Sequence, residues 1–364
     1  MLNGKMSLRS HRVPGGLYFG PPAWDAPLWP AVDPIAATPP ADAPQSATQL
    51  CELAHRLNFS RNDIWTPSLS EQLRIAGEEA RYIILNLIPP QPESIMSSLL
   101  SEFELPRMVA ALQRVCQCFP AAQARVAIAR NEYNLRYQWR ASAKKNKWRI
   151  RPLVNRYPQG HPTILLRALL GLKLQPGESP ARHGVILLDP ITCWTLGYWL
   201  DTGRCPDWHP IEVFTHNMRP CVIAAPLGQP LAKILTDAGI HCDSRQCIIN
   251  GMMAGKLVDP AATVLEPWMQ MISLRPPPAL EMAVDCIRCG WCVNACPSGL
   301  NPAGLMAQVR IMDCLSAVAA HEADACIECG LCSYVCPSRL PLAVTIRGMK
   351  HTNQDSALVS GGRS

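Results

Sequence analysis

The chain has 364 residues, of which 48% are apolar and 17% are charged, and its formal net charge is +6. This composition excludes a disordered chain, and the length allows two or three small domains. No run reaches the roughly 18 apolar residues needed to span a bilayer, and residues 1–5 lack the apolar core of a secretory signal. We therefore expect a cytoplasmic chain that is either soluble or peripheral to a membrane.

Prolines crowd the start of the chain. Nine of the 35 prolines lie between residues 14 and 44. Proline lacks a backbone N–H and fixes φ, so this stretch sustains neither a helix nor a central strand. We predict that residues 1–45 form an arm lying over another surface.

Residues 46–215 alternate between helical and extended patterns. Residues 47–58 and 95–118 are predicted helices, whereas residues 82–86 and 184–189 are short apolar runs typical of buried strands. This alternation predicts an α/β domain with a partly parallel sheet.

Within this domain, residues 125–152 carry nine lysines and arginines against the single acid Glu132, with tyrosines and tryptophans between them. The pattern allows a solvated basic face, a docking site for an acidic redox partner, or a nucleic-acid site. We favour the solvated face and expect no nucleic acid, because no recognised nucleic-acid motif accompanies the charge.

Residues 216–272 have a different pattern. An extended apolar run over residues 219–228 is followed by a short helix over residues 230–239, which ends at a glycine, and by a second strand over residues 247–251. This order predicts a small β-grasp domain.

Two cysteine runs dominate the C-terminal part. Residues 286–297 and 326–337 both read C-x2-C-x2-C-x3-C-P, the run that binds [4Fe–4S] clusters in two-cluster ferredoxins. Gly290 and Gly330 leave room for a cluster and can adopt positive φ. Tetrahedral zinc sites are the alternative, but they need two cysteine pairs per metal, not four evenly spaced thiolates before a proline. The candidate metal and cofactor ligands are therefore Cys286, Cys289, Cys292, Cys296, Cys326, Cys329, Cys332 and Cys336.

In such runs the fourth cysteine binds the other cluster, which makes the two clusters neighbours and so forms a relay. We assign cluster I to Cys286, Cys289, Cys292 and Cys336. Cluster II then takes Cys326, Cys329, Cys332 and Cys296. Between the runs, apolar residues at three- to four-residue spacing from residue 301 to residue 319 predict a helix, and Cys314 within it is expected to be a structural thiol. Residues 273–348 form the predicted two-cluster domain, and residues 349–364 a flexible tail.

The order of these segments resembles the RnfC family, the peripheral subunit of a membrane electron-transport complex. The resemblance rests on Val13-Pro14-Gly15-Gly16-Leu17, on Arg156-Tyr157-Pro158-Gln159-Gly160, on residues 227–239 and on the double cysteine run. It implies a degenerate Rossmann-like domain that resembles an FMN- and NADH-binding domain, an SLBB-like β-grasp domain, and an α-helical ferredoxin domain. The fold class is thus multidomain, α/β plus α+β.

The sequence departs from the family at its flavin site. The family's glycine-rich loop, G-x-G-G-A-G-F-P-T, is replaced by residues 58–67, which contain no glycine. Its acidic stretch is replaced by Asn86-Leu87-Ile88-Pro89-Pro90-Gln91-Pro92, and its next glycine pair by Gly160-His161. Phosphate cradles need closely approaching backbone N–H groups, which is why they use glycine. We therefore expect neither FMN nor NADH.

These patterns predict a shortened RnfC-like subunit that relays electrons through two [4Fe–4S] clusters, with no catalytic acid, base or nucleophile and no NADH oxidation of its own. Trp291, Arg288 and Glu328 in the cluster loops are candidates for tuning potentials or contacting a partner. The expected partners are other redox subunits, either Rnf-like membrane subunits or a ferredoxin-type carrier. Membrane subunits would bring the chain to the cytoplasmic face of the inner membrane. Three alternatives remain: an NADH-dependent flavin and iron–sulfur oxidoreductase, a non-catalytic iron–sulfur scaffold, and a subunit of a different dehydrogenase.

Overall fold

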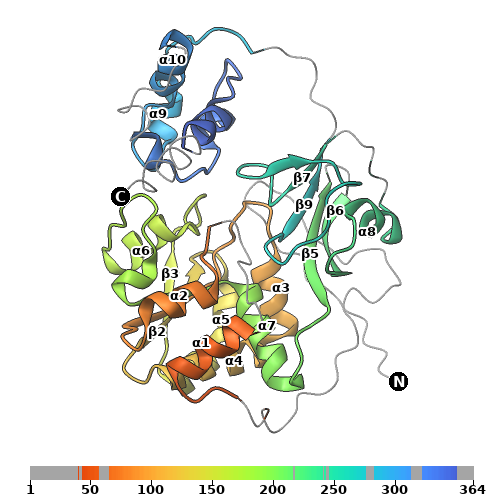
Figure 1. The fold of residues 1–364 in the computed structure, drawn as a ribbon. Coiled ribbons are helices and arrows are strands. Elements are labelled where there is room, and N and C mark those ends of the chain that lie inside the picture. Colours follow the sequence, from red (N-terminus) through yellow and green to blue (C-terminus); the bar gives the residue numbers. More distant parts are fainter. Residues whose placement is uncertain are drawn as a thin grey trace, which may run out of the picture. The chain divides into compact units, whose positions relative to one another are not determined.

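The computed structural model describes residues 40, 43–56, 65–215, 218–240, 242, 246–275, 283–312 and 322–350 (Figure 1). They belong to two compact units, the first within residues 1–169 and 179–277 and the second within residues 170–178 and 278–364. Most of the predicted arm, Cys314 and residues 351–364 lie outside the described residues.

The first unit contains a four-stranded sheet in the order β3-β2-β1-β4, with every neighbouring pair parallel. Its strands are β1 (Tyr82–Asn86), β2 (Gln123–Ala129), β3 (Arg149–Leu153) and β4 (Val185–Leu188). The predicted strands at residues 82–86 and 184–189 are confirmed, and so is the parallel sheet. On the outer edge, the side-chain amide of Gln72 bonds both the N–H and the carbonyl of Leu187 in β4, at 2.7 and 2.9 Å.

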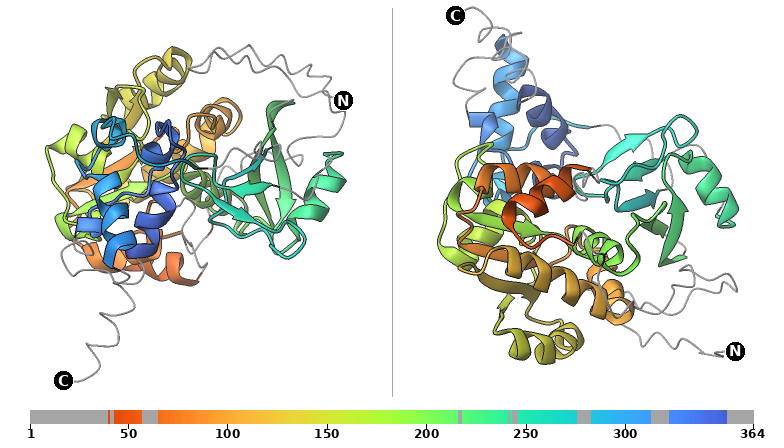
Figure 2. Two further views of the ribbon diagram at one scale, coloured as in Figure 1. Left: turned by 90° about the horizontal axis from the view of Figure 1, so that it is seen from above. Right: turned by 60° about the horizontal axis from the view of Figure 1, so that its bottom comes forward.

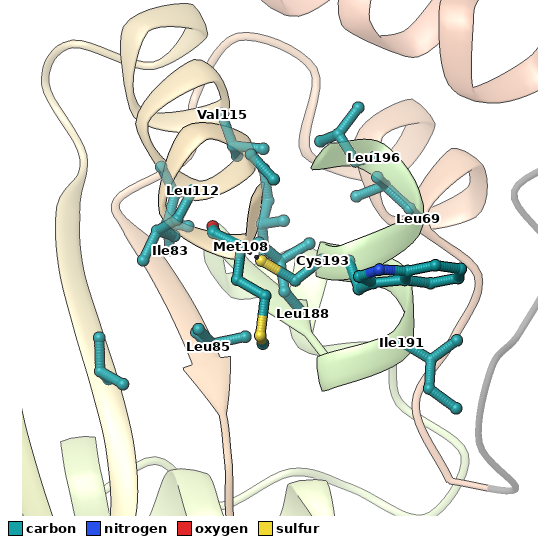
Figure 3. Packing of buried hydrophobic residues seen from close by; sticks show 14 of the residues in the cluster. Leu69, Ile83, Leu85, Met108, Leu112, Val115, Leu188, Ile191, Cys193 and Leu196 are labelled. Carbon is teal, nitrogen blue, oxygen red and sulfur yellow. Dashed lines mark hydrogen bonds between the residues drawn. The ribbon is translucent and has the colours of Figure 1, made fainter. Parts of the chain in front are cut away.

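Helices cover both faces of this sheet. They are α1 (Ala47–Arg56), α2 (Leu69–Ala76), α3 (Met96–Phe103), α4 (Leu105–Cys118), α5 (Tyr133–Asn146), α6 (Pro162–Leu170), the 3-10 helix η1 (Pro180–His183) and α7 (Pro190–Thr202). One face of the sheet forms the main core with α1 to α5 and α7. Figure 3 shows part of this core, where Met108, Leu112 and Val115 of α4 lie beside Ile83 and Leu85 of β1.

The predicted helix over residues 95–118 is divided in two, which corrects the sequence expectation. α3 ends at Phe103, and α4 begins at Leu105 after Glu104, whose φ is −123°. Pro106 stands in the first turn of α4. Proline is tolerated there, but inside a continuous helix it would remove a hydrogen bond and clash with the preceding turn.

Helices α4 and α7 cross at close range. A Cβ on Gly197 of α7 would lie 2.2 Å from the carbonyl oxygen of Arg107 on α4, so the crossing requires glycine. The same arginine donates to Glu104 Oε2 at 2.8 Å and to Asp201 Oδ2 at 2.6 Å, with all three side chains at most 7% exposed. Cys193 Sγ donates to Met108 O at 3.3 Å (Figure 3).

A second, five-stranded sheet has the order β6-β5-β9-β7-β8. Its elements are β5 (Trp208–Thr215), β6 (Met218–Pro226), α8 (Leu231–Asp237), β7 (Cys247–Ile249), β8 (Lys256–Val258) and β9 (Met271–Leu274). Only the β5–β9 pair is parallel. α8 packs on this sheet in both views of Figure 2. Because β5 pairs with β6 and β9, the second sheet begins before residue 216, within the predicted α/β segment.

The proline-rich stretch after β1 connects the two sheets of this unit. Glu212 of β5 is 1% exposed, and its Oε1 accepts hydrogen bonds from Ser94 Oγ at 3.1 Å and from Ile95 N at 2.6 Å. Glu93 Oε1 accepts a bond from Met252 N at 3.0 Å. Gln91 packs so closely on Gly251, whose φ is +89°, that a Cβ there would lie 2.3 Å from its side chain. Residues 91–95 therefore connect the second sheet to the first through hydrogen bonds and close packing.

The second unit contains the short helices α9 (Trp291–Ala295) and α12 (Leu331–Tyr334), the helix α10 (Pro302–Met312) and a helical segment over residues 342–350. α10 confirms the first part of the helix predicted after the first cysteine run, and the remainder lies outside the described residues. Among the helices that the structure describes, none is long and apolar enough to cross a membrane.

Candidate iron–sulfur site

The two cysteine loops have the same backbone geometry, 40 residues apart. Arg288 and Glu328 occupy equivalent positions and have φ values of 56° and 57°. Two residues later, Gly290 and Gly330 have φ values of 75° and 79° and precede α9 and α12. The left-handed conformation predicted for these two glycines is therefore observed. Each loop thus has two residues of positive φ immediately before a short helix that contains its third cysteine.

The eight predicted ligands differ in exposure. Cys286 and Cys289 are exposed, whereas Cys292 and Cys329 are buried. The other four, Cys296, Cys326, Cys332 and Cys336, are half-buried. Cys292 of the first run and Cys332 and Cys336 of the second pack in one apolar cluster with Met306, Leu340 and Leu342. The fold thus places the fourth cysteine of the second run beside the first run.

Cys296 of the first run lies near the second run. Burial and the neighbouring thiols of Cys326, Cys329 and Cys296 together raise the pKa of Cys332 to about 12. Burial likewise raises the pKa of Cys329 to about 11, with Cys326 and Cys296 adding to the effect. Contacts agree with this placement, because Leu300, whose amide bonds Cys296 Sγ, packs against the same apolar cluster as Cys326. Binding iron requires loss of these protons, which couples cluster insertion to pH.

Backbone amides donate to ligand sulfurs in both runs. Glu328 N lies 3.3 Å from Cys326 Sγ, and Leu300 N lies 3.4 Å from Cys296 Sγ. Such bonds to ligand sulfurs are one means by which a protein sets a cluster potential. In the described part of the chain, no three Cys, His, Asp or Glu side chains already converge on a single point where a metal ion would fit. The division of the eight ligands between two clusters therefore stays a prediction.

A second place to examine is the carboxyl edge of the parallel sheet, where open α/β sheets bind ligands. There the side-chain amide of Asn86 donates to Gly160 O at 2.9 Å, and its carbonyl accepts from Ile88 N at 3.2 Å. A Cβ on Gly160 would lie 3.0 Å from Ile88 O. Trp65 lies beside Tyr157 and His161, with its ring tilted toward the first at a centroid distance of 6.0 Å and edge-on to the second at 5.1 Å.

Buried apolar residues and prolines occupy this edge of the sheet. Leu87 is fully buried and Ile88 is 4% exposed, and the amide of Asn86 is occupied within the chain. Pro89, Pro90 and Pro92 carry no backbone N–H, and such groups are what cradles a phosphate. Most of the stretch that replaces the glycine-rich loop, its residues 58–64, lies outside the described residues.

The basic segment over residues 125–152 comprises β2, α5 and β3. Two of its aromatic rings, Trp139 and Trp148, are buried in the main core, whereas Tyr133 and Tyr137 are 69% and 79% exposed. Arg125 donates to Leu169 O at 2.8 Å. The tryptophans are therefore core residues and do not form a surface for stacking bases.

Comparison with known families agrees with both parts of the chain. Residues 285–341 match a 4Fe-4S dicluster domain, and residues 68–196 match the Nuo51 FMN-binding domain. The chain therefore combines an iron–sulfur dicluster domain with an α/β domain of the FMN-binding type.

Individual relatives share one description, since each is the RnfC component of an ion-translocating oxidoreductase complex. The protein of Pectobacterium atrosepticum is 30% identical over 170 residues, covering 44% of this chain and 24% of that protein. The protein of Rhodobacter capsulatus is 27% identical, covering 46% of this chain and 33% of that protein. The matched region thus spans a quarter to a third of these relatives. The predicted resemblance is confirmed, and the chain is RnfC-like.

Among solved structures, an NAD+-reducing [NiFe]-hydrogenase in its H2-reduced state matches with a TM-score of 0.54 at 12% identity. The match covers 76% of this chain and 54% of that one. The air-oxidised state gives a TM-score of 0.52 at 14% identity. At this identity the match concerns the fold alone.

Proposed function

We propose that this chain is an electron-transfer subunit of a larger redox complex and holds two [4Fe–4S] clusters. The observation that carries the proposal is the pair of cysteine loops with equal backbone geometry, in which each run contributes one thiol to the other's neighbourhood. Cys286, Cys289, Cys292 and Cys336 would hold cluster I, and Cys326, Cys329, Cys332 and Cys296 would hold cluster II. When bound, each cluster supplies one-electron transfer.

The chain's own residues would position the clusters and set their environment. The amides of Leu300 and Glu328 would stabilise ligand sulfurs, and the apolar cluster around Met306 would limit access of water to the inner thiolates. No proton needs to move during the transfer, which agrees with the absence of a predicted acid, base or nucleophile. Partner subunits would supply and remove the electrons and would account for any membrane association.

A variant of one ligand tests the assignment. Cys289→Ser should alter the line positions of one cluster's EPR signal in the reduced protein, whereas the other cluster should keep its line positions and lose only the broadening caused by its reduced neighbour. Cys296→Ser should alter the other signal, although Cys296 belongs to the same sequence run as Cys289. If both variants changed the same signal, the exchange of fourth ligands between runs would be wrong.

For the first unit, we propose a degenerate, Rossmann-like flavin domain beside an SLBB-like β-grasp domain. The proline-rich residues 89–92 and the occupied amide of Asn86 support the loss of FMN and NADH binding. The same segment also has a structural role, because residues 91–95 contact the second sheet through hydrogen bonds. The test is to denature the purified protein and measure the released flavin. Less than a tenth of an equivalent is expected.

An NADH-oxidising flavin and iron–sulfur protein is the second candidate, since residues 68–196 match an FMN-binding domain. It predicts about one equivalent of FMN, whose absorbance bleaches when NADH is added without oxygen. That result would overturn the degenerate-site proposal and leave the cluster assignment intact.

A further inference from the structure

The second cysteine loop is held by two cations from the helical segment over residues 342–350. Lys350 Nζ donates to Cys326 O at 3.0 Å and to Glu328 Oε1 at 2.9 Å. Arg347 Nε forms an ion pair with Glu328 Oε2 at 3.1 Å. The three side chains are between 18% and 27% exposed, so water screens them only in part.

These contacts fix the loop beside a predicted ligand. Glu328 has a φ of 57°, which is uncommon for a residue with a side chain, and its amide donates to Cys326 Sγ at 3.3 Å. Lys350 and Arg347 hold the Glu328 side chain while Lys350 also bonds the carbonyl of Cys326 itself. Lys350 and Arg347 thus stabilise both the backbone turn at Glu328 and the hydrogen bond from its amide to Cys326 Sγ.

The charges at the two loops differ although their backbones match. At the position of Glu328, the first loop has Arg288, which is exposed. Glu328 pairs with the two cations Arg347 and Lys350, so these three partly buried side chains carry a net positive charge. The charge of Lys350 lies close to the ligand, since its Nζ is 3.0 Å from the carbonyl oxygen of Cys326.

A cluster gains one negative charge when it is reduced, so a nearby fixed cation favours the reduced form, and the effect weakens with solvent exposure. Water screens the effect of the exposed Arg288 on a cluster potential. Lys350 is less exposed and bonds the backbone of a ligand, so its effect on the potential is screened less. The two clusters should therefore respond differently to loss of a neighbouring cation.

Resting on the proposed ligand sets, we propose that Lys350 and Arg347, joined by Glu328, are positioning residues that stabilise the reduced form of cluster II. They make the two clusters inequivalent, so that an electron shared between them resides more on cluster II than it would without these cations.

The experiment is a redox titration of the full chain with both clusters present, followed by EPR, on Lys350→Gln and on the matched control Arg288→Gln. The Cys289→Ser and Cys296→Ser variants assign the two signals beforehand. Lys350→Gln should lower the reduced-to-oxidised ratio of cluster II at a fixed potential about tenfold, which is 59 mV for one electron. Cluster I should change less than twofold. Arg288→Gln should leave cluster II unchanged.

Two further variants separate charge from structure. Glu328→Gln removes the anion and should raise the potential of cluster II, the opposite direction to Lys350→Gln. If Lys350→Gln lowers the iron content, the titration of Arg347→Gln decides the matter, because that residue does not bond the ligand's backbone. Equal shifts of both clusters, or a change below twofold in cluster II, would overturn the inference. Correct ligand assignments together with no Lys350 effect would reject this inference alone.

Discussion

Glu212 offers a sharp test of how the two sheets of the first unit are joined. The carboxyl group is buried between them, and burial raises its pKa to about 8 despite the hydrogen bonds from Ser94 and Ile95. Glu212 also lines a cavity of about 10 Å³, together with Gln91, Asn250 and Gln270, which has room for about one water. At neutral pH we therefore expect the folded protein to hold this carboxyl protonated.

The direction of the pH effect follows from linkage. The ordinary pKa of 4.5 applies in the unfolded chain, so folding takes up a proton between pH 4.5 and pH 8. The contribution of Glu212 to stability is full below that window and is lost as the pH rises through it, by about 1.4 kcal/mol per pH unit. Between pH 5 and pH 8 the total loss is up to about 4 kcal/mol. Glu93, the nearest acidic neighbour, acts in the same direction on the pKa of Glu212.

Glu212→Gln should remove this dependence, because an amide accepts the bonds from Ser94 and Ile95 and donates toward the cavity without titrating. The assay is urea unfolding of the full protein without oxygen at pH 5, 6, 7 and 8, followed by fluorescence of the buried tryptophans. The variant should gain stability relative to the wild type as the pH rises, and the exposed Glu52→Gln should not. Parallel curves for Glu212→Gln and the wild type would refute a buried, protonated Glu212.

Three other positions give predictions for the same unfolding assay. Gly197→Ala should cost about 3 kcal/mol, since its Cβ would overlap the carbonyl of Arg107 and force α4 and α7 apart. Arg107→Met should lower the free energy of unfolding by about 3–5 kcal/mol, because it leaves Glu104 and Asp201 buried without their cation. Adding Glu104→Gln and Asp201→Asn to this variant should recover much of that loss. Burial lowers the pKa of His209, bonded to Met269 O at 2.7 Å, to about 4. Its stabilising effect is therefore present above pH 6.5 and lost as the pH falls toward 4, and His209→Gln should abolish that slope. An unaltered midpoint for Gly197→Ala, or an unaltered acid slope for His209→Gln, would contradict these assignments.

The sequence was sufficient for features that depend on local spacing. The eight cysteines and the two glycines of their loops follow from a pattern that tolerates little variation. β1 and β4 were predictable because strands buried on both faces are continuous apolar runs. β2 and β3 were missed since Arg125 and Arg149, which pair across them, obscure the apolar signal. β3 lies at an edge of the sheet and is largely exposed, where charged residues are tolerated.

Features that depend on distant contacts could not be predicted. The stretch over residues 86–92 departs from the family's pattern in the sequence, but the contacts of Gln91 with Gly251 and of the nearby Glu93 with Met252 join segments about 160 residues apart. Lys350 and Arg347 were likewise missed, because only the folded loop brings them to Glu328. Their spacing of three residues in a helical segment was the one local signal available.

The central claim is that two [4Fe–4S] clusters lie next to each other and share ligands between the two cysteine runs. The most direct test is EPR of the fully reduced protein, combined with iron analysis. The account predicts about eight iron atoms per chain and a spectrum broadened by magnetic interaction between two reduced clusters, which is lost when Cys289→Ser or Cys296→Ser alters either one. Four iron atoms, or two independent signals without interaction, would contradict it.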